Sequence, residues 1–141
     1  MSEIKNPKIM PNNLEAEQSL LGSMMIDDEV TTEILSELNE KDFYMNSHRL
    51  IFNAMYDLQR EGKPVDIITL SDKLSKSTEK DKYGNVSTTD NLQKVGGMSY
   101  LTELTDAIPS SANYRYYFNI VKKKGMLRTI INASNRISEN K

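Results

Sequence analysis

One stretch of the chain, residues 12–28, constrains the fold more than any other. Its apolar residues recur at helical spacing and form one broad stripe, made of Leu14, Ala16, Leu20, Leu21, Met24, Met25 and Ile26. Asn12 is followed three residues later by Glu15, which is the spacing of a capping box, so we expect the helix to begin there. Gly22, in the interior, costs about 1 kcal/mol relative to alanine and indicates that another backbone approaches closely. The stretch therefore predicts a core helix around which the rest of the chain packs.

The length and composition are those of one soluble globular domain. A chain of 141 residues can bury roughly two-thirds of its unfolded surface. The net charge is −2 with the signs interspersed, so no overall field favours nucleic acid or an anionic membrane. The absence of cysteine excludes disulfides, thiolate metal sites and a cysteine nucleophile. No window approaches the ~18 apolar residues of a membrane span, and no secretory signal is evident. We expect a cytoplasmic protein with no membrane partner.

The pattern of apolar residues and helix signals predicts an all-α bundle of six helices without a sheet. Residues 1–11 are polar with two prolines and are expected to form a flexible N-terminal arm, followed by a helical head over residues 12–110. The predicted starts of the second to fifth helices are Asp27 or Asp28, Ser47, Asp66, and Gly96 or Gly97, and Gly62 is the predicted end of the third. The longest periodic run, residues 114–137, lies in a final segment over residues 111–141.

Residues 75–91 differ from their surroundings. Serine, threonine, lysine and acidic residues dominate this segment, and Tyr83 and Val86 are its only sizeable apolar residues. Such a composition cannot bury much apolar surface. We therefore predict a long mobile loop here.

No combination of residues in the sequence indicates a catalytic, cofactor-binding or metal-binding site. Gly62-Lys63 is not a phosphate-binding loop, because Pro64 stands where the hydroxyl residue should be. His48 is the only histidine, and without cysteine or a neighbouring carboxylate cluster it is a poor metal ligand and an unsupported general base. We expect this chain not to be an enzyme by itself.

The best candidate for nucleic-acid binding is a basic cluster on the last helix. Lys122, Lys123 and Lys124 lie between Arg115 and Arg128. Three consecutive lysines point over a wide arc of a helix, which is typical of a solvated face. A small DNA-binding module remains an alternative, and its binding would weaken steeply with salt.

Several short motifs, taken in order, are similar to one family. They are Pro11 to Gly22, Asp42-Phe43-Tyr44, His48 to Met55, Pro64-Val65-Asp66, Gly96 to Leu101, Asn113 with Tyr117, Ile120-Val121, and Arg128 with Ile131. Together they resemble the N-terminal domain of DnaB-type bacterial replicative DNA helicases, from Pro11 to Ile137. Two departures stand out. Residues 75–91 are longer than is usual in the family, and the chain stops at Lys141, where the family continues with a second hairpin helix, a linker and an ATPase domain.

The resemblance implies a globular head plus the first arm of a helical hairpin, which together form a non-catalytic collar domain of a hexameric helicase. ATP and Mg²⁺ would belong to the ATPase domain that this chain lacks. The implied partners are DnaG-type primase, a helicase loader in some bacteria, further copies of the domain and, through the parent hexamer, DNA. Residues that match family positions linked to primase contact are Glu15, Tyr100, Ile131 and Ile137. Their structural alternatives are a capping box for the first and intradomain packing for the others.

For self-association we favour Tyr117, Val121 and Leu127 on the long helix. The nearest alternative identity is the helicase-binding domain of a primase, which is similar in fold. The motif from Ala16 to Gly22, close to Met1, favours the helicase.

Overall fold

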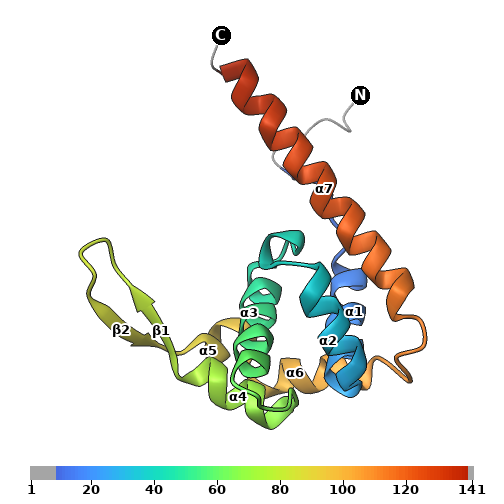
Figure 1. The fold of residues 1–141 in the computed structure, drawn as a ribbon, viewed down its shortest axis with the longest axis vertical. Helices are drawn as coiled ribbons and strands as arrows, with labels where there is room; N and C mark the ends of the chain where they lie inside the picture. The colour runs from blue at the N-terminus through green and yellow to red at the C-terminus, as the bar shows by residue number, and fades with distance from the viewer. Residues whose placement is uncertain (1–8, 140–141) are drawn as a thin grey trace.

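The computed structural model describes residues 9–139, so most of the predicted N-terminal arm lies outside the described residues. Within that range the helices are α1 (Leu14–Ile26), α2 (Asp28–Glu37), the 3-10 turn η2 (Glu40–Asp42), α3 (Asn46–Arg60), α4 (Ile67–Ser75), α5 (Asn91–Val95), α6 (Gly97–Asp106) and α7 (Tyr114–Glu139), and the strands are β1 (Ser77–Lys80) and β2 (Val86–Thr89). Helices α1 to α6 form a head from which α7 projects (Figure 1). The all-α class is confirmed, with a short helix, α5, and two strands beyond the prediction.

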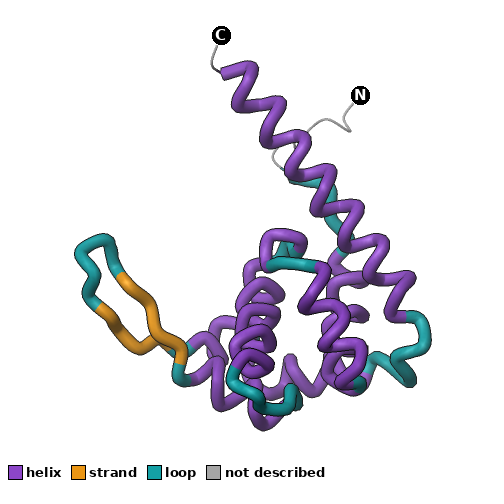
Figure 2. The backbone as a smooth tube through the Cα atoms, viewed as in Figure 1, coloured by secondary structure: helices purple, strands orange, loops and turns teal. Residues whose placement is uncertain are grey.

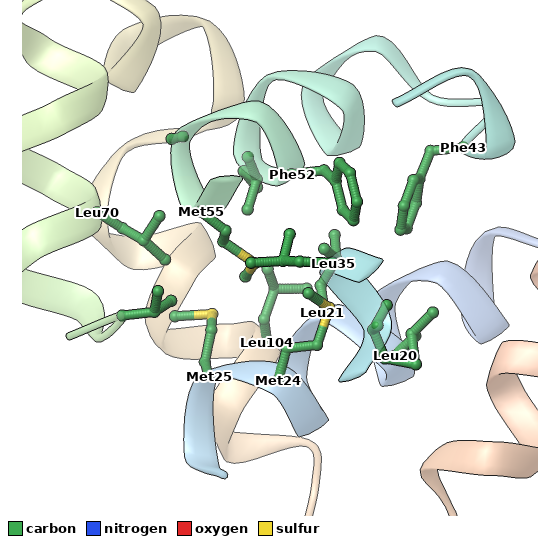
Figure 3. Packing of buried hydrophobic residues seen from close by; sticks show 14 of the residues in the cluster. Leu20, Leu21, Met24, Met25, Leu35, Phe43, Phe52, Met55, Leu70 and Leu104 are labelled. Atoms are coloured by element: carbon green, nitrogen blue, oxygen red, sulfur yellow. The ribbon is translucent and has the colours of Figure 1, made fainter. Parts of the chain in front are cut away.

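Helix α1 lies at the centre of the head, as its stripe predicts. It packs against α2, α3, α6 and α7. The buried side chains around it interlock, and Figure 3 shows Leu20, Leu21 and Met24 directed toward side chains from α3 and α6. Phe43 and Phe52 close one end of this core with ring centroids 5.2 Å apart. The core therefore ties sequence-distant elements to one helix.

The start of α1 is displaced by one residue from the prediction. Asn13 is the N-cap, and its side chain accepts a hydrogen bond from the backbone N–H of Ala16 at 3.0 Å. Asn12 instead donates to the carbonyl of Met10. The predicted capping box of Asn12 and Glu15 is therefore wrong. Adjacent asparagines have the same capping chemistry, and only the path by which the backbone enters the helix determines which of them is the N-cap.

Three of the other predicted helix starts are confirmed and one is wrong. Helix α6 begins at Gly97 after Gly96, as predicted. Asp27 caps α2 through the N–H of Glu29, and Asp66 caps α4 in a capping box with Thr69. Ser47 does not cap α3, because the helix begins at Asn46 after Met45, whose side chain makes no capping bond. A carboxylate from α1 reaches this helix start instead, as described below.

Two glycines mark places where backbones meet. A Cβ atom added at Gly22 would lie 2.3 Å from the carbonyl oxygen of Leu104 on α6. The close approach predicted at this position is confirmed. A Cβ atom at Gly125 would lie 3.1 Å from the Cα of Asp42, so α7 touches η2 at a second such point.

Most of the segment predicted as a loop over residues 75–91 is instead a β-hairpin, which spans residues 77–89, while Ser75 ends α4 and Asn91 begins α5. Strands β1 and β2 pair antiparallel, with Ser77 opposite Thr89 and Lys80 opposite Val86. The carboxylate of Asp81 accepts hydrogen bonds from the N–H groups of Tyr83 and Asn85 and so closes the turn. Figure 2 shows this hairpin standing apart from the helices. Local turn chemistry organises the segment without a buried core, which is why apolar periodicity did not reveal it.

Helix α7 has two different halves. Its first half packs on α1 and η2, and its second half extends beyond the head (Figure 1). The residues on the head-facing side are spaced alternately by four and three: Tyr114, Phe118, Val121, Gly125 and Arg128. None of the helices within residues 9–139 is long and apolar enough to cross a membrane.

Candidate partner-binding site

A chain of buried polar side chains links three helices inside the head. Glu17 on α1 is 1% exposed, and His48 on α3 has no exposed surface. Nδ1 of His48 lies 2.7 Å from Oε1 of Glu17. The same carboxylate accepts the backbone N–H of Tyr44 at 2.6 Å and that of Met45 at 3.4 Å, immediately before α3. Glu17 therefore supplies the anionic partner that the N-terminus of α3 lacks among its own residues.

The chain continues from His48 to the surface of α6. Nε2 of His48 lies 2.7 Å from the hydroxyl of Tyr100, and the two rings are stacked with an interplanar angle of 12°. Gln18 on α1 donates to the same hydroxyl at 3.1 Å. Burial raises the pKa of Tyr100 above its ordinary value of 10.0, and the neighbouring carboxylates of Glu103 and Glu17 act in the same direction, whereas the hydrogen bond from Gln18 lowers it.

His48 is therefore a structural residue of the head interior. Its carboxylate partner lies 31 residues earlier in the chain, so sequence proximity could not reveal it. With no exposed surface, the imidazole cannot reach an external substrate. Within the described residues no group of three or more His, Cys, Asp or Glu side chains could hold a metal ion.

Arg128 fixes α7 to the head. It is 6% exposed and donates to the carbonyls of Pro11 and Asp42, each at 2.8 Å, and of Lys41 at 3.2 Å. Its guanidinium lies 5.6 Å from the ring centroid of Tyr44. Burial lowers the pKa of Arg128 below its ordinary value, and the nearby charge of Glu17 opposes that shift. The buried cation satisfies the end of η2 and the entry to α1.

These contacts divide the basic cluster predicted as a nucleic-acid candidate. Arg128 is buried, and Arg115 forms ion pairs with Glu33 and, at 3.1 Å, with Glu37. Lys122 donates to the carbonyl of Glu37 at 3.4 Å. Three of the five basic residues therefore bond within the domain, which does not favour the alternative of a DNA-binding module.

The four residues matched to primase contact fall in two places. Glu15 is exposed at the start of α1, beside a cleft of about 470 Å³ between α1 and α7, and Gln18, which bonds Tyr100, lies one helical turn further on. Ile131 and Ile137 lie on the projecting half of α7, where Ile137 is 67% exposed. The predicted contact residues therefore divide between the head and the projecting half of α7, which we call the stem.

The residues favoured for self-association also differ in their surroundings. Val121 is 1% exposed and belongs to the core, and Tyr117 is half-buried against it. Leu127 is 36% exposed. In this conformation the domain itself covers the side chain of Val121, so of the three Leu127 is the most open to a partner.

An apolar stripe runs along α7, mostly on the side that faces away from the head. We call it the outer stripe, and it consists of Tyr116, Ile120, Leu127, Ile130 and Ile137. The spacings of four, seven, three and seven place these residues on one side of a helix, opposite Phe118 and Gly125. Tyr116 and Ile137 are each 67% exposed and Ile130 is 58% exposed. Ile120 is half-buried against the core, and the other four side chains of the outer stripe are exposed to solvent.

Comparisons with known proteins agree with this architecture. The family model described as the DnaB-like helicase N-terminal domain matches residues 9–123. The replicative DNA helicase DnaC of Bacillus subtilis is 36% identical over 139 residues, which are 99% of this chain and 28% of that protein. The replicative DNA helicase DnaB of Buchnera aphidicola subsp. Baizongia pistaciae is 41% identical over 128 residues, 91% of this chain and 25% of that protein. The chain therefore spans about a quarter of the length of these relatives.

Solved structures give the same result. The N-terminal domain of DnaB helicase from Mycobacterium tuberculosis superposes with a TM-score of 0.78 at 33% identity and covers 93% of this chain and 83% of that one. A DnaB-like replicative helicase, described together with its interactions with primase, gives a TM-score of 0.75 at 27% identity over 91% of this chain and 27% of that one. From the matched residues and the shared fold, the chain belongs to the DnaB-like helicase N-terminal domain family.

Proposed function

We propose that this domain is a non-catalytic collar domain of a hexameric replicative DNA helicase, which associates with further copies of itself and recruits a DnaG-type primase. The outer stripe of α7 is the observation that carries the proposal. Family membership supports it, as does the similar helicase described with primase interactions. In this proposal the domain works in the cytoplasm and binds neither ATP nor Mg²⁺, which would act in the ATPase domain of the full helicase. Contact with DNA would come through the hexamer, and a loader would be a further partner.

The outer stripe supports self-association because its residues combine large apolar area with coiled-coil spacing. Burying a side chain such as Ile130 or Ile137 contributes roughly 1.5–3 kcal/mol relative to leaving it exposed. Mixed spacings of three, four and seven suit a second helix lying along α7. A helix from the same or another copy, laid along the stripe, would bury residues that the head leaves exposed.

Primase recruitment is proposed for the surface that contains Glu15 and Tyr100, together with Ile131 and Ile137 on the stem. The first pair lies on α1 and α6, and the second lies on a helix that projects from them. A partner that contacts both would have to span the angle between head and stem. This arrangement favours a partner with two contact regions.

The test of primase recruitment is a calorimetric titration with the C-terminal domain of the cognate primase at physiological salt. Saturable binding to the primase domain, and none to duplex or single-stranded DNA, is the expected result. Glu15→Ala should weaken it, whereas Glu29→Ala, an exposed glutamate on α2, serves as the matched control. Binding to DNA but not to the primase domain, by this chain and by the full hexamer, would refute the proposal.

Self-association is tested by sedimentation equilibrium over a range of concentrations. Ile130→Glu places a charge in the outer stripe and should shift the population toward monomer. Asn132→Glu adds the same charge at another exposed position of α7 and should leave it unchanged. Equal dissociation constants for the two variants would exclude the outer stripe as the contact.

A further inference from the structure

In the buried series of hydrogen bonds that joins Glu17, His48 and Tyr100, chemistry determines which group donates and which accepts. Glu17 accepts two backbone N–H groups at the start of α3, so its ionised carboxylate acts only as an acceptor. The group facing it at 2.7 Å, Nδ1 of His48, must therefore carry a proton. In a neutral imidazole Nε2 is then an acceptor.

The next step fixes the hydroxyl of Tyr100. Nε2 of His48 lies 2.7 Å from it, so the O–H of Tyr100 donates inward to His48. Gln18 donates to the oxygen of the same hydroxyl at 3.1 Å. The single proton of the phenol is thus used inside the head, and the oxygen retains one lone pair. Any further hydrogen bond to Tyr100 must be one that its oxygen accepts.

Packing holds the ring in the same place. The imidazole of His48 is stacked on it, with centroids 6.0 Å apart. At the base of the Tyr100 side chain, Gly96 has a φ of 109° and comes so close that an added Cβ atom would lie 2.9 Å from Cβ of Tyr100. Both the ring and the hydroxyl are therefore fixed before any partner arrives.

We propose that Glu17 and His48 are positioning residues for Tyr100, which hold its hydroxyl as an inward donor so that it presents only an acceptor and a fixed ring to a partner. The partner group that recognises the hydroxyl of Tyr100 is then a hydrogen-bond donor, not an acceptor. The part that concerns the partner rests on the proposed primase recruitment, whereas the direction of the hydrogen bonds from Tyr100 to Glu17 does not.

The direction of the hydrogen bonds between Tyr100, His48 and Glu17 is tested by the imidazole ¹⁵N resonances of the labelled protein at neutral pH. Because His48 is the only histidine, its two nitrogen signals need no assignment by mutation. A protonated Nδ1 with an unprotonated Nε2 is the expected state. A proton on Nε2, in the other tautomer or in an imidazolium, would overturn the proposal. This measurement involves no partner, so it decides the positioning role even if primase recruitment fails.

The consequence for binding is tested by a double-mutant cycle with the primase domain. His48→Asn keeps a donor near the Nδ1 position and removes the acceptor at Nε2, and Tyr100→Phe removes the hydroxyl alone. Each should weaken binding by about fivefold, the worth of one neutral hydrogen bond. Together they should weaken it no more than Tyr100→Phe does, because the two changes remove one interaction.

The control is Tyr56→Phe, which removes a tyrosine hydroxyl from the half-exposed outer face of α3 and should leave affinity unchanged. Circular dichroism and thermal unfolding establish that each variant is folded. If the effect of His48→Asn persists in full in the Tyr100→Phe background, or if a folded His48→Asn variant binds as the wild type does, His48 does not act through Tyr100. Absence of binding by the wild type would instead refute primase recruitment, and the ¹⁵N result would still decide the positioning role.

Discussion

Replacing Gly22 by alanine tests the contact between α1 and α6. The new methyl carbon would lie 2.3 Å from the carbonyl oxygen of Leu104 and 2.9 Å from Cγ1 of Ile108. The carbonyl belongs to the backbone of α6 and cannot rotate away, so the helices must separate by about 1 Å to reach ordinary van der Waals contact. Alanine gains about 1 kcal/mol in helix propensity. Overpacking costs about 3 kcal/mol at the upper end of its usual range. We expect the free energy of unfolding to fall by about 2 kcal/mol.

The assays for Gly22→Ala are urea unfolding, which gives the free energy of unfolding, and thermal unfolding, both followed by far-UV circular dichroism. A loss of this size should lower the melting temperature by about 8 °C, at about 4 °C per kcal/mol for a domain of this length. Ser36→Ala, on the exposed side of α2, is the control and should change stability by no more than about 0.5 kcal/mol. If Gly22→Ala is as stable as the wild type, the helices do not approach as described.

Three further predictions concern other parts of the domain. Arg128→Met removes three charge-assisted hydrogen bonds to backbone carbonyls and should cost about 2–4 kcal/mol of stability in the same urea assay; an unchanged midpoint would contradict it. The hydrogen bond from Ser111 holds the pKa of Asp27 below its ordinary value of 3.8, so its stabilising contribution is complete above that value and is lost as the pH falls toward the folded-state pKa. The stability difference between wild type and Ser111→Ala should therefore be constant near neutral pH and shrink in acid, and a difference that grows in acid would exclude this linkage. Replacing residues 78–88 of the hairpin by Asn-Gly should leave the melting temperature of the head nearly unchanged, because those residues are exposed; a large fall would show that the hairpin supports the core.

The parts of the fold that follow from local chemistry were predictable. The caps at Asp27 and Asp66 and the close approach at Gly22 each depend on one residue type in a clear context. The ordered sequence motifs also indicated the family. In contrast, the hairpin is held together by turn geometry and backbone pairing, which apolar periodicity does not report. Its expected mobility stays a prediction.

The interior of the candidate site was harder to predict because its partners are far apart in the chain. His48 looked isolated, yet Glu17 and Tyr100 lie on either side of it, 31 and 52 residues away. Arg128 looked like part of a basic face, yet its guanidinium donates hydrogen bonds to carbonyls inside the domain. A buried arginine and an exposed one look the same in a sequence, and only the packing of the folded protein distinguishes them. The contact roles of Glu15, Tyr100, Ile131 and Ile137 stay predictions, as do the self-association roles of Tyr117, Val121 and Leu127.

The attachment of α7 has a mechanical consequence. The first half of the helix packs on α1, Gly125 and Arg128 contact η2 close to its midpoint, and the second half projects beyond the head. From Arg128 to the last described turn the arm is about 16 Å long at 1.5 Å per residue. A tilt of about 10° at this pivot would move its far end by about 3 Å, more than half of one helical turn. The head thus holds the first half of α7, and the projecting half converts slight adjustments of a few carbonyl contacts into displacements large enough to change which side chains meet.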